Sequence, residues 1–140
     1  MSIAIYPALV FTVALLVTTA YFLLGGLPLL VLDHDTAVDA KFVRSFFNIY
    51  YKVAFITAVG AALSFAALGR PSFAIGAGAL AWTSTLLRDR LIPKMDQLGA
   101  AIQTDGLPAI GRFRQIHCIA LLINLFQLAL LVWALLKFSQ

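Results

Sequence analysis

Long apolar runs alternate with short polar gaps along the chain, and this pattern predicts helices that cross a membrane. Segments without a charged side chain cover residues 3–32, 53–68, 73–87 and 119–136. A helix needs about 20 mostly apolar residues to cross the hydrocarbon core of a bilayer, and each run reaches that length with its flanking residues. Because a backbone in lipid must satisfy its own hydrogen bonds, we expect helices rather than strands. The predicted spans cover residues 3–32, 47–69, 71–90 and 113–137.

The gaps between the runs are short, so successive helices must lie side by side and antiparallel. We therefore predict one all-α domain over residues 1–140, an integral membrane four-helix bundle without a soluble domain. The first run would be about 45 Å long as a straight helix, which exceeds the hydrocarbon thickness of about 30 Å. Pro28 removes a helical hydrogen bond and disfavours helix at Leu27. This long helix is therefore expected to kink, or to give way to a short new segment, near Gly25–Pro28.

The charges are distributed unevenly over the gaps. If the helices alternate, the two termini share one side of the membrane, and only Arg70 and Lys137 lie on that side. The other eight basic residues lie on the opposite side: Lys41, Arg44, Lys52, Arg88, Arg90, Lys94, Arg112 and Arg114. Since cytoplasmic loops of membrane proteins are enriched in Lys and Arg, residues 33–46 and 91–112 are expected to be cytoplasmic loops. Both termini are then expected to be non-cytoplasmic.

Composition narrows the classes of function. Hydrophobic residues make up 62% of the chain, and its net charge is +4. Orientation and contact with anionic lipid headgroups account for this charge, so membrane lipids are expected partners and nucleic acid is not. Cys118 is the only cysteine and cannot form an internal disulfide, and the chain has no glycine-rich phosphate-binding motif. The small residues between Gly60 and Gly78 indicate close helix packing.

A first cluster of candidate residues lies where the first predicted helix ends and the second begins. Asp33 and Asp35 flank His34, and Arg44 and Asn48 are one turn apart on the second helix. Two interpretations remain open. In one, a cation of the second helix such as Arg44 pairs with the aspartates in a structural network at the membrane interface. In the other, His34 transfers protons and its flanking carboxylates raise its pKa.

The third predicted helix leaves the membrane through a second polar cluster. Thr85 and Asp89 lie four residues apart and so share a face, which makes Asp89 a candidate residue at this end. Arg90 and Lys94 are like charges at the same spacing, which is unfavourable unless an anion lies between them. Asp96, Asp33 or a lipid headgroup could supply this anion.

The fourth predicted helix carries polar residues inside an apolar run. His117 and Asn124 are seven residues apart and share one face, with Gln127 near that face and Arg114 close to one turn before His117. Polar residues within a membrane helix normally face the bundle interior or a cavity, and they are functional candidates by default. In the structural alternative, Asn124 and Gln127 join helices by hydrogen bonds, and His117 is a packing residue.

Both histidines fall at the same end of the predicted bundle, on helices that are neighbours in a four-helix arrangement. Bundle cores hold cofactors between facing helices. His34 and His117 are therefore candidate ligands for a haem or, together with Asp33 or Asp35, for a metal ion. The sequence does not decide whether the protein holds either cofactor.

Several short patterns stand at the helix ends: Phe46, Tyr50 and Tyr51, then Pro93 and Met95, then Phe113-Arg114-Gln115-Ile116-His117 with Asn124. Through these residues the chain resembles the small four-span family typified by transmembrane protein 205, which has no settled biochemical activity. A looser resemblance, to anthrone-oxygenase-like four-span proteins, is carried by Gly25-Gly26, Thr85 with Pro93, and Arg112 with His117. This second resemblance implies oxidation of polycyclic aromatic substrates by His117 and a nearby Arg. The residues after His117 depart from that pattern because they include no Arg: Cys118, Ile119 and Ala120.

Two classes of function remain open. The first is a small membrane protein without catalytic activity, an accessory or binding module for lipid headgroups, another subunit, a second copy of the chain or a lipophilic small molecule. The second is a membrane oxidoreductase or oxygenase that acts on a lipophilic or aromatic substrate. In that enzyme His117 is the base or ligand, His34 relays protons and Arg114 stabilises an anion. The candidate pocket lining is Asp33, Arg44, Asn48, Asp89 and Asn124.

Overall fold

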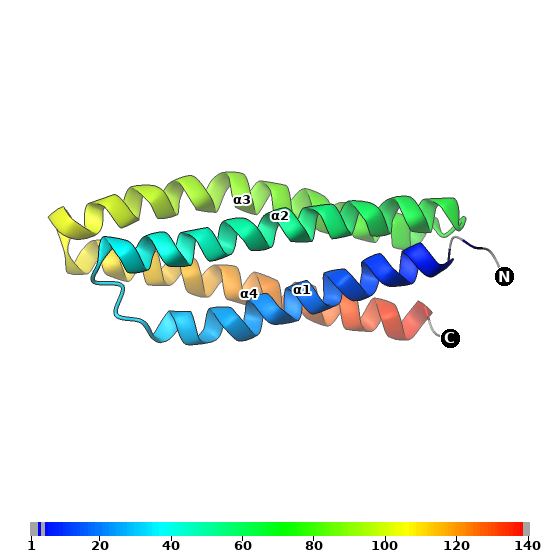
Figure 1. Ribbon diagram of the computed structural model, residues 1–140, viewed down its shortest axis with the longest axis horizontal. Helices are drawn as coiled ribbons and strands as arrows, with labels where there is room; N and C mark the ends of the chain where they lie inside the picture. The colour runs from blue at the N-terminus through cyan, green and yellow to red at the C-terminus, as the bar shows by residue number, and fades with distance from the viewer. Residues whose placement is uncertain (1–2, 4, 139–140) are drawn as a thin grey trace.

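The computed structural model describes residue 3 and residues 5–138, and this part of the chain forms four helices. They are α1 (Ile5–Val31), α2 (Ala37–Ala67), α3 (Pro71–Asp105) and α4 (Leu107–Phe138). The prediction of an all-α helical bundle is confirmed. Figure 1 shows the α1–α2 and α3–α4 connections at one end of the long axis, and the start of α1 and the end of α4 at the other. We call these ends the connection end and the terminal end.

Each helix packs against two neighbours, because α1 and α3 each contact both α2 and α4. The arrangement is a ring of antiparallel helices around a shared core. The main buried cluster draws on all four helices and includes Phe22 of α1, Phe47 of α2, Met95 of α3 and Phe113 of α4. A smaller cluster that includes Ala8, Ala61, Phe65 and Ala77 extends the core.

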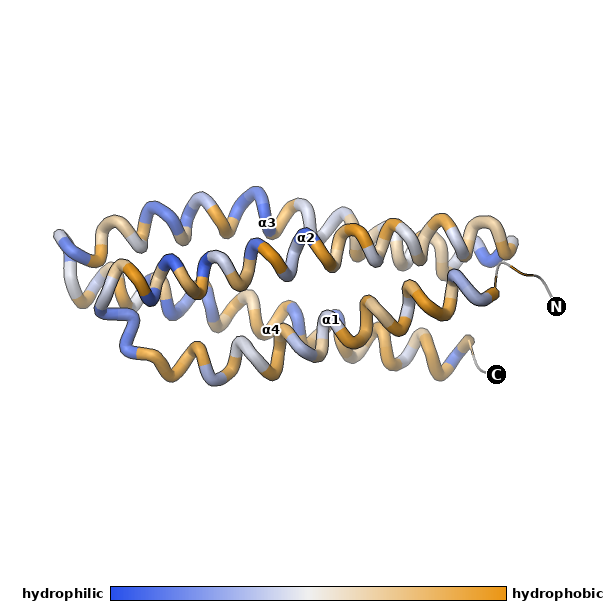
Figure 2. The backbone as a smooth tube through the Cα atoms, viewed as in Figure 1, coloured by the Kyte–Doolittle hydropathy of each residue, from blue (hydrophilic) through white to orange (hydrophobic). Residues whose placement is uncertain are grey.

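The lengths and compositions of the helices fit an integral membrane protein. Among the described residues, α1, α2 and α4 are long and apolar enough to cross a bilayer. The apolar run of α3 is rich in Ala, Gly, Ser and Thr and is less hydrophobic, so its crossing stays a prediction. Only 28%, 33% and 28% of the most apolar windows of α1, α2 and α4 are buried in the bundle. The remaining apolar side chains form a surface for lipid, and Figure 2 shows that hydrophobic residues dominate the terminal half.

α1 continues through Pro28 to Val31 as one helix, so no separate segment begins near Gly25–Pro28. Close packing against α4 accompanies this continuation. A Cβ at Gly26 would lie 2.5 Å from Cδ2 of Leu121, so only glycine allows this approach without displacement of the leucine. The contact between α1 and α4 at Gly26 therefore lies in the helical turn that Pro28 weakens by removing a backbone hydrogen bond.

Most of the residues expected in loops over 33–46 and 91–112 are helical, which corrects that expectation, and of these residues only 33–36 and Gly106 connect the helices. α2 begins at Ala37 after the N-cap Thr36, and α3 reaches Asp105 before Gly106, with φ 58°, turns the chain into α4. The extensions bury an apolar stripe: Val43, Phe47, Ile92, Met95, Ile102, Ala109 and Phe113. With its 35 residues, α3 is about 52 Å long. The bundle is therefore longer than a hydrocarbon core of about 30 Å.

Candidate functional site

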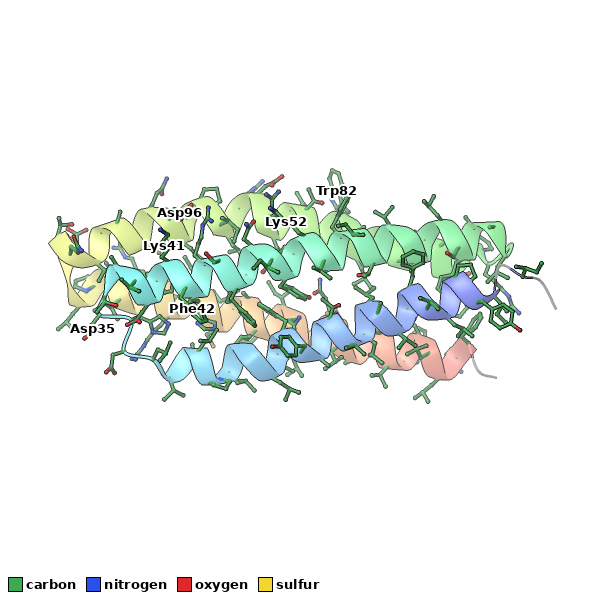
Figure 3. All side chains as sticks on the ribbon, viewed as in Figure 1. Asp35, Lys41, Phe42, Lys52, Trp82 and Asp96 are labelled. Carbon is green, nitrogen blue, oxygen red and sulfur yellow. The ribbon has the colours of Figure 1, made fainter. Side chains whose placement is uncertain are left out.

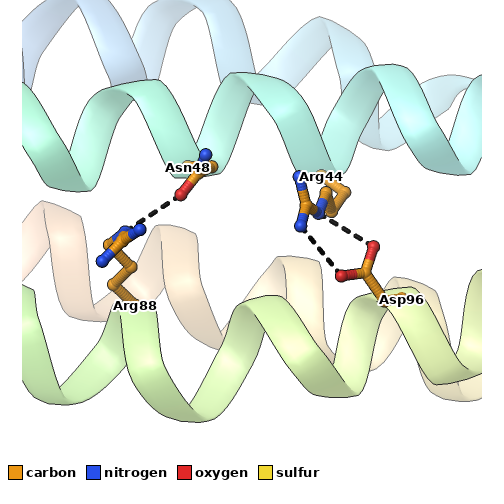
Figure 4. A network of polar contacts seen from close by, with 4 residues as sticks. All are labelled: Arg44, Asn48, Arg88 and Asp96. Atoms are coloured by element: carbon orange, nitrogen blue, oxygen red, sulfur yellow. Dashed lines mark hydrogen bonds and ion pairs between the residues drawn. The ribbon is translucent and has the colours of Figure 1, made fainter.

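Charged side chains gather toward the connection end, where Figure 3 places Asp35, Lys41 and Asp96. Arg44 of α2 forms a two-point contact with Asp96 of α3 (Figure 4): Nε lies 2.8 Å from Oδ1, and Nη2 donates to Oδ2 at 2.9 Å. The two side chains are 31% and 54% exposed, so the pair contributes less than about 1 kcal/mol. Asp96, one of the three candidate anions for Arg90 and Lys94, thus pairs with a cation of the neighbouring helix.

A second polar contact joins α2 and α3. Nε of Arg88 donates to Oδ1 of Asn48 at 3.0 Å (Figure 4). Asp89 lies 3.9 Å from the Arg88 guanidinium, and its side chain is 64% exposed. Among the described residues, no hydrogen bond or ion pair links Asn48 or Asp89 to either histidine. These candidates therefore belong to the α2–α3 seam and the outer surface.

Arg114 of α4 binds the C-terminal end of α1. Its Nη2 donates to the carbonyl of Leu32 at 2.8 Å and lies 3.9 Å from Oδ1 of Asp33. Carbonyls at a helix C-terminus have no partner within the helix, so this guanidinium supplies one from α4. Arg114 thus ties the beginning of α4 to the end of α1, directly beside His34.

His34 and His117 lie together in the core of the connection end. Both side chains are 0% exposed, their ring centres are 5.9 Å apart, and their planes cross at 82°. Phe113 lies 5.4 Å from His34, and Phe47 lies 5.0 Å from His117, again between ring centres. The expected closeness of the two histidines is observed, and aromatic neighbours pack against both rings.

The hydrogen bond of His117 fixes its tautomer. Its Nε2 lies 3.0 Å from the carbonyl oxygen of Gly26, and since a carbonyl only accepts, Nε2 carries the proton. Nδ1 of the neutral ring is left with a lone pair and no partner. Neither ring nitrogen of His34 forms a hydrogen bond of standard geometry, although the Leu32 carbonyl lies near that ring. Each such buried atom costs about 1–3 kcal/mol, which is unusual for histidines that serve only in packing.

His34 is also unusual in its backbone and its protonation. Its φ of 56° lies in the left-handed region, which non-glycine residues rarely adopt. Burial lowers the pKa of His34 by more than the nearby Leu32 carbonyl raises it; Arg114 lowers it further, and Asp39 and Asp33 act in the opposite direction. The flanking carboxylate of Asp33 thus acts in the expected direction, but the expected net rise of this pKa is wrong because desolvation of the ring dominates.

The polar residues deeper in the bundle pair with one another. Nδ2 of Asn124 donates to the Tyr50 hydroxyl at 2.8 Å, and this hydroxyl donates to Oε1 of Gln127 at 3.4 Å. The ring of Tyr50 stacks on Phe22 with 3.9 Å between centres. This geometry supports the interpretation of Asn124 and Gln127 as residues that join helices. Tyr50 is a member of the network that sequence reasoning missed, since its partners lie 74 and 77 residues away.

A pocket of about 480 Å³ lies toward the terminal end. All four helices contribute to its walls, for example through Leu15, Phe65, Ala77 and Leu131. Gln127 brings an amide group to a lining that is otherwise mostly aliphatic and aromatic. None of the site candidates from the sequence lines it: Asp33, His34, Arg44, Asn48, Asp89, Arg114, His117 and Asn124. The expected site and the observed pocket are therefore different places.

The small residues between Gly60 and Gly78 have two different effects. A Cβ at Gly60 would meet the ring of Phe11 at 2.5 Å, so the expected close packing is found there. A Cβ at Gly76 or Gly78 would meet no atom within 4 Å, and Gly76 lines the pocket together with Ala77. These two glycines of α3 thus leave space, whereas Ala77 between them is buried in the core.

The residues at the connection end do not form a haem site or a metal site with three ligands. Among the described residues, no group of three His, Cys, Asp or Glu side chains could hold a metal ion, and the side chain of Asp33 is 89% exposed. A haem between His34 and His117 would need an open slot beside the two rings, whereas both are fully buried and packed against Phe113 and Phe47. Haem therefore does not fit this packing, and two imidazoles remain as donors.

Comparison of the chain with protein-family models, with curated proteins and with solved structures finds no significant match. The resemblance to four-span families stays a prediction from short patterns. Function must accordingly be argued from the geometry of this chain.

Proposed function

We propose that the protein is a membrane-embedded binding module without catalytic activity, and that its ligand is a lipophilic molecule in the pocket near the terminal end. The pocket is the observation that carries this proposal. Its volume of about 480 Å³ falls within the about 300–1,000 Å³ of small-molecule sites, which are typically apolar with a few polar groups.

Two polar groups in the lining indicate the chemistry of the ligand. The Gln127 amide accepts a hydrogen bond from Tyr50 through its oxygen, and its nitrogen donates no hydrogen bond to the described residues. Lys137, near the end of α4, adds a positive charge to the lining. An amphiphile with an apolar body and an anionic head, such as a fatty acid, matches this combination.

The charge distribution supports an orientation for the bundle. Eight of the ten Lys and Arg residues belong to residues 41–52, 88–94 and 112–114, and such enrichment marks the cytoplasmic side. In this orientation the connection end is cytoplasmic, both termini are non-cytoplasmic, and the ligand lies in the non-cytoplasmic half. Labelling of single cysteines at residues 105 and 137, in a Cys118→Ser background, tests the assignment. Labelling of residue 105 from outside the cell would contradict it.

The alternative function, oxidation of a lipophilic or aromatic substrate at His117, has less support. A general base must come within hydrogen-bond reach of its substrate, whereas His34 and His117 are both fully buried. Neither histidine lines the pocket. Lipid headgroups, another subunit or a second copy of the chain remain proposed partners of the exposed polar and apolar surfaces.

The two tryptophans provide a direct test of ligand binding. Trp133 lines the pocket and Trp82 lies outside the lining, although the two side chains are similarly exposed, at 60% and 65%. A brominated fatty acid, added to protein in nanodiscs, should quench Trp133 fluorescence saturably in a Trp82→Phe variant. In a Trp133→Phe variant, quenching of Trp82 should rise only with the amount of fatty acid dissolved in the bilayer. Non-saturable quenching of both tryptophans would contradict the proposal.

A matched pair of glycines controls for general effects on the protein. Gly76 lines the pocket and Gly78 does not, and an added Cβ clashes at neither position. Gly76→Leu should weaken fatty-acid binding about tenfold, the effect of about 1.4 kcal/mol, and Gly78→Leu should leave it unchanged. Equal effects of the two substitutions would place the ligand elsewhere.

A further inference from the structure

We infer that His34 and His117 form a two-coordinate binding site for Cu(I), a soft monovalent cation. The inference is independent of the proposed lipophilic ligand, because neither histidine lines the pocket. It rests on a fully buried pair of imidazoles in which three of the four ring nitrogens form no hydrogen bond of standard geometry.

His117 has the arrangement of a metal-binding histidine. Its Nε2–H donates to the Gly26 carbonyl, and histidines that bind metals almost always donate their other ring N–H to a carbonyl, carboxylate or water. This bond orients the ring and leaves the Nδ1 lone pair inside the packed cluster without a donor. A bound cation would satisfy that lone pair.

His34 provides the second donor. Its backbone lies in the left-handed region, and such conformations persist only where the surrounding structure holds them, often at functional sites. Both of its ring nitrogens are buried without a hydrogen bond of standard geometry, and the Leu32 carbonyl near the ring can hold the N–H of one nitrogen, which leaves the other as the donor. Burial lowers the pKa of His34, which favours the neutral ring that metal coordination requires.

The separation of the rings fits one ion between them. With metal–nitrogen bonds of about 2 Å, an ion in line between two imidazole nitrogens places the ring centres about 6 Å apart. The observed distance is 5.9 Å. The ring planes cross at 82° in an edge contact, so coordination in line requires one imidazole to turn until its lone pair points at the ion.

The number and type of donors select the ion. Structural zinc takes four ligands, and calcium and magnesium require six or more, mostly oxygen. The described residues supply no group of three His, Cys, Asp or Glu side chains. Cu(I) has a filled d shell and accepts two donors in line, and imidazole suits copper. A single charge also costs less to bury beside Phe47 and Phe113 than a double charge.

Two features near the histidine pair affect cation binding: a group of aspartates that attracts cations, and a cysteine that could compete for Cu(I). Asp33 and Asp35 flank His34 and are exposed, and Asp39, in the first turn of α2, is half-buried. These carboxylates attract cations to this connection. Cys118 follows His117 in the sequence but is exposed. Its thiol would bind Cu(I) independently and must be removed in any test.

The test measures anaerobic Cu(I) binding by the full chain carrying Cys118→Ser, in detergent. Competition with a chromophoric Cu(I) chelator should give one ion per chain. X-ray absorption on the same sample should show two nitrogen neighbours with imidazole scattering and no sulfur, and this measurement needs no histidine variant. Ag(I) should displace the copper, and Zn²⁺ should not. Absence of binding, a sulfur neighbour or tighter binding of Zn²⁺ would overturn the inference.

The variant His117→Gln separates coordination from packing. A glutamine Nε2 can keep the hydrogen bond to the Gly26 carbonyl, whereas the Nδ1 donor is lost. We expect this variant, and His34→Gln, to bind Cu(I) more than about 100-fold more weakly, because loss of an outer-shell partner alone costs about 10–100-fold. Melting curves without metal check that both variants fold. Folded variants that bind as tightly as the Cys118→Ser parent would exclude the two histidines as ligands.

Discussion

The interiors of the two ends of the bundle differ in packing and in polarity. At the connection end, His34 and His117 are fully buried among Phe47 and Phe113, so polar atoms are held in dense packing. Toward the terminal end, small residues such as Gly76 leave a mostly apolar pocket of about 480 Å³. One end offers donor atoms without room for a molecule, and the other offers room with few polar atoms. The concentration of charge in a membrane protein therefore does not locate the space in which a ligand fits.

The largest expected effect comes from removing an aromatic ring at each end. Phe113 is 0% exposed, so Phe113→Ala should destabilise the protein by about 3–5 kcal/mol. Phe126 lines the pocket and is 65% exposed, so Phe126→Ala should cost less than about 1 kcal/mol. Unfolding in detergent with increasing denaturant measures both. Similar costs would show that the two ends are packed alike.

A methyl group added at two glycines gives the next largest contrast. At Gly26 a Cβ would approach Leu121 to 2.5 Å, so Gly26→Ala should destabilise the protein by about 1–3 kcal/mol. At Gly76 a Cβ meets no atom within 4 Å, so Gly76→Ala should stabilise the helix by up to about 1 kcal/mol. Thermal melting of both variants checks the opposite signs. A stabilised Gly26→Ala variant would mean that α1 and α4 are less closely packed than observed.

The buried histidine should make stability depend on pH. Burial lowers the pKa of His34 in the folded protein, so below its ordinary value of about 6.5 the unfolded chain takes up a proton that the folded chain does not. Stability is therefore complete above about pH 6.5 and is lost as the pH falls toward the folded-state pKa. The slope for this one proton is at most about 1.4 kcal/mol per pH unit.

Melting temperatures between about pH 8 and pH 5 measure this dependence. The variant His34→Gln lacks the titrating group and should show a shallower decline than the native chain. Identical pH profiles for the two proteins would mean that His34 is protonated as readily when folded as when unfolded.

The smallest expected effect concerns the α2–α3 seam at the connection end. Arg44 and Asp96 form a well-oriented but partly exposed ion pair, so a double-mutant cycle with Arg44→Gln and Asp96→Asn should give a coupling below about 1 kcal/mol. High salt should reduce it further. A coupling of several kcal/mol would indicate that this seam is shielded from water, unlike the observed exposure.

Local patterns in the sequence were enough to predict the helical bundle, but not the extent of its helices. The apolar runs predicted four helices, and the turn at Gly106 follows from a glycine before Pro108. Residues 91–105 of α3 were expected to belong to a loop because many of their side chains are polar or charged. They are helical because residues spaced by whole turns, such as Met95 and Ile102, are buried.

The sequence could predict only those parts of the candidate site whose positions follow from where the helices end. His34 and His117 meet because both stand at the same end of neighbouring helices. The partners of Tyr50 could not be predicted, since they depend on the rotation of α2 relative to α4. The pocket could not be predicted either, because a small residue permits contact at Gly60 but leaves space at Gly76. Which outcome occurs depends on the side chain that the neighbouring helix presents.

The length of α4 sets the depth of the histidine pair in the bilayer. From His117 to the end of the helix at Phe138, about 21 residues span about 32 Å, close to the hydrocarbon thickness of about 30 Å. With Phe138 at one membrane surface, the pair lies at the boundary between hydrocarbon and headgroups on the other. Cell membranes differ in thickness by several ångströms. The same chain would therefore hold its imidazoles beside headgroup water in a thin membrane and beside acyl chains in a thick one.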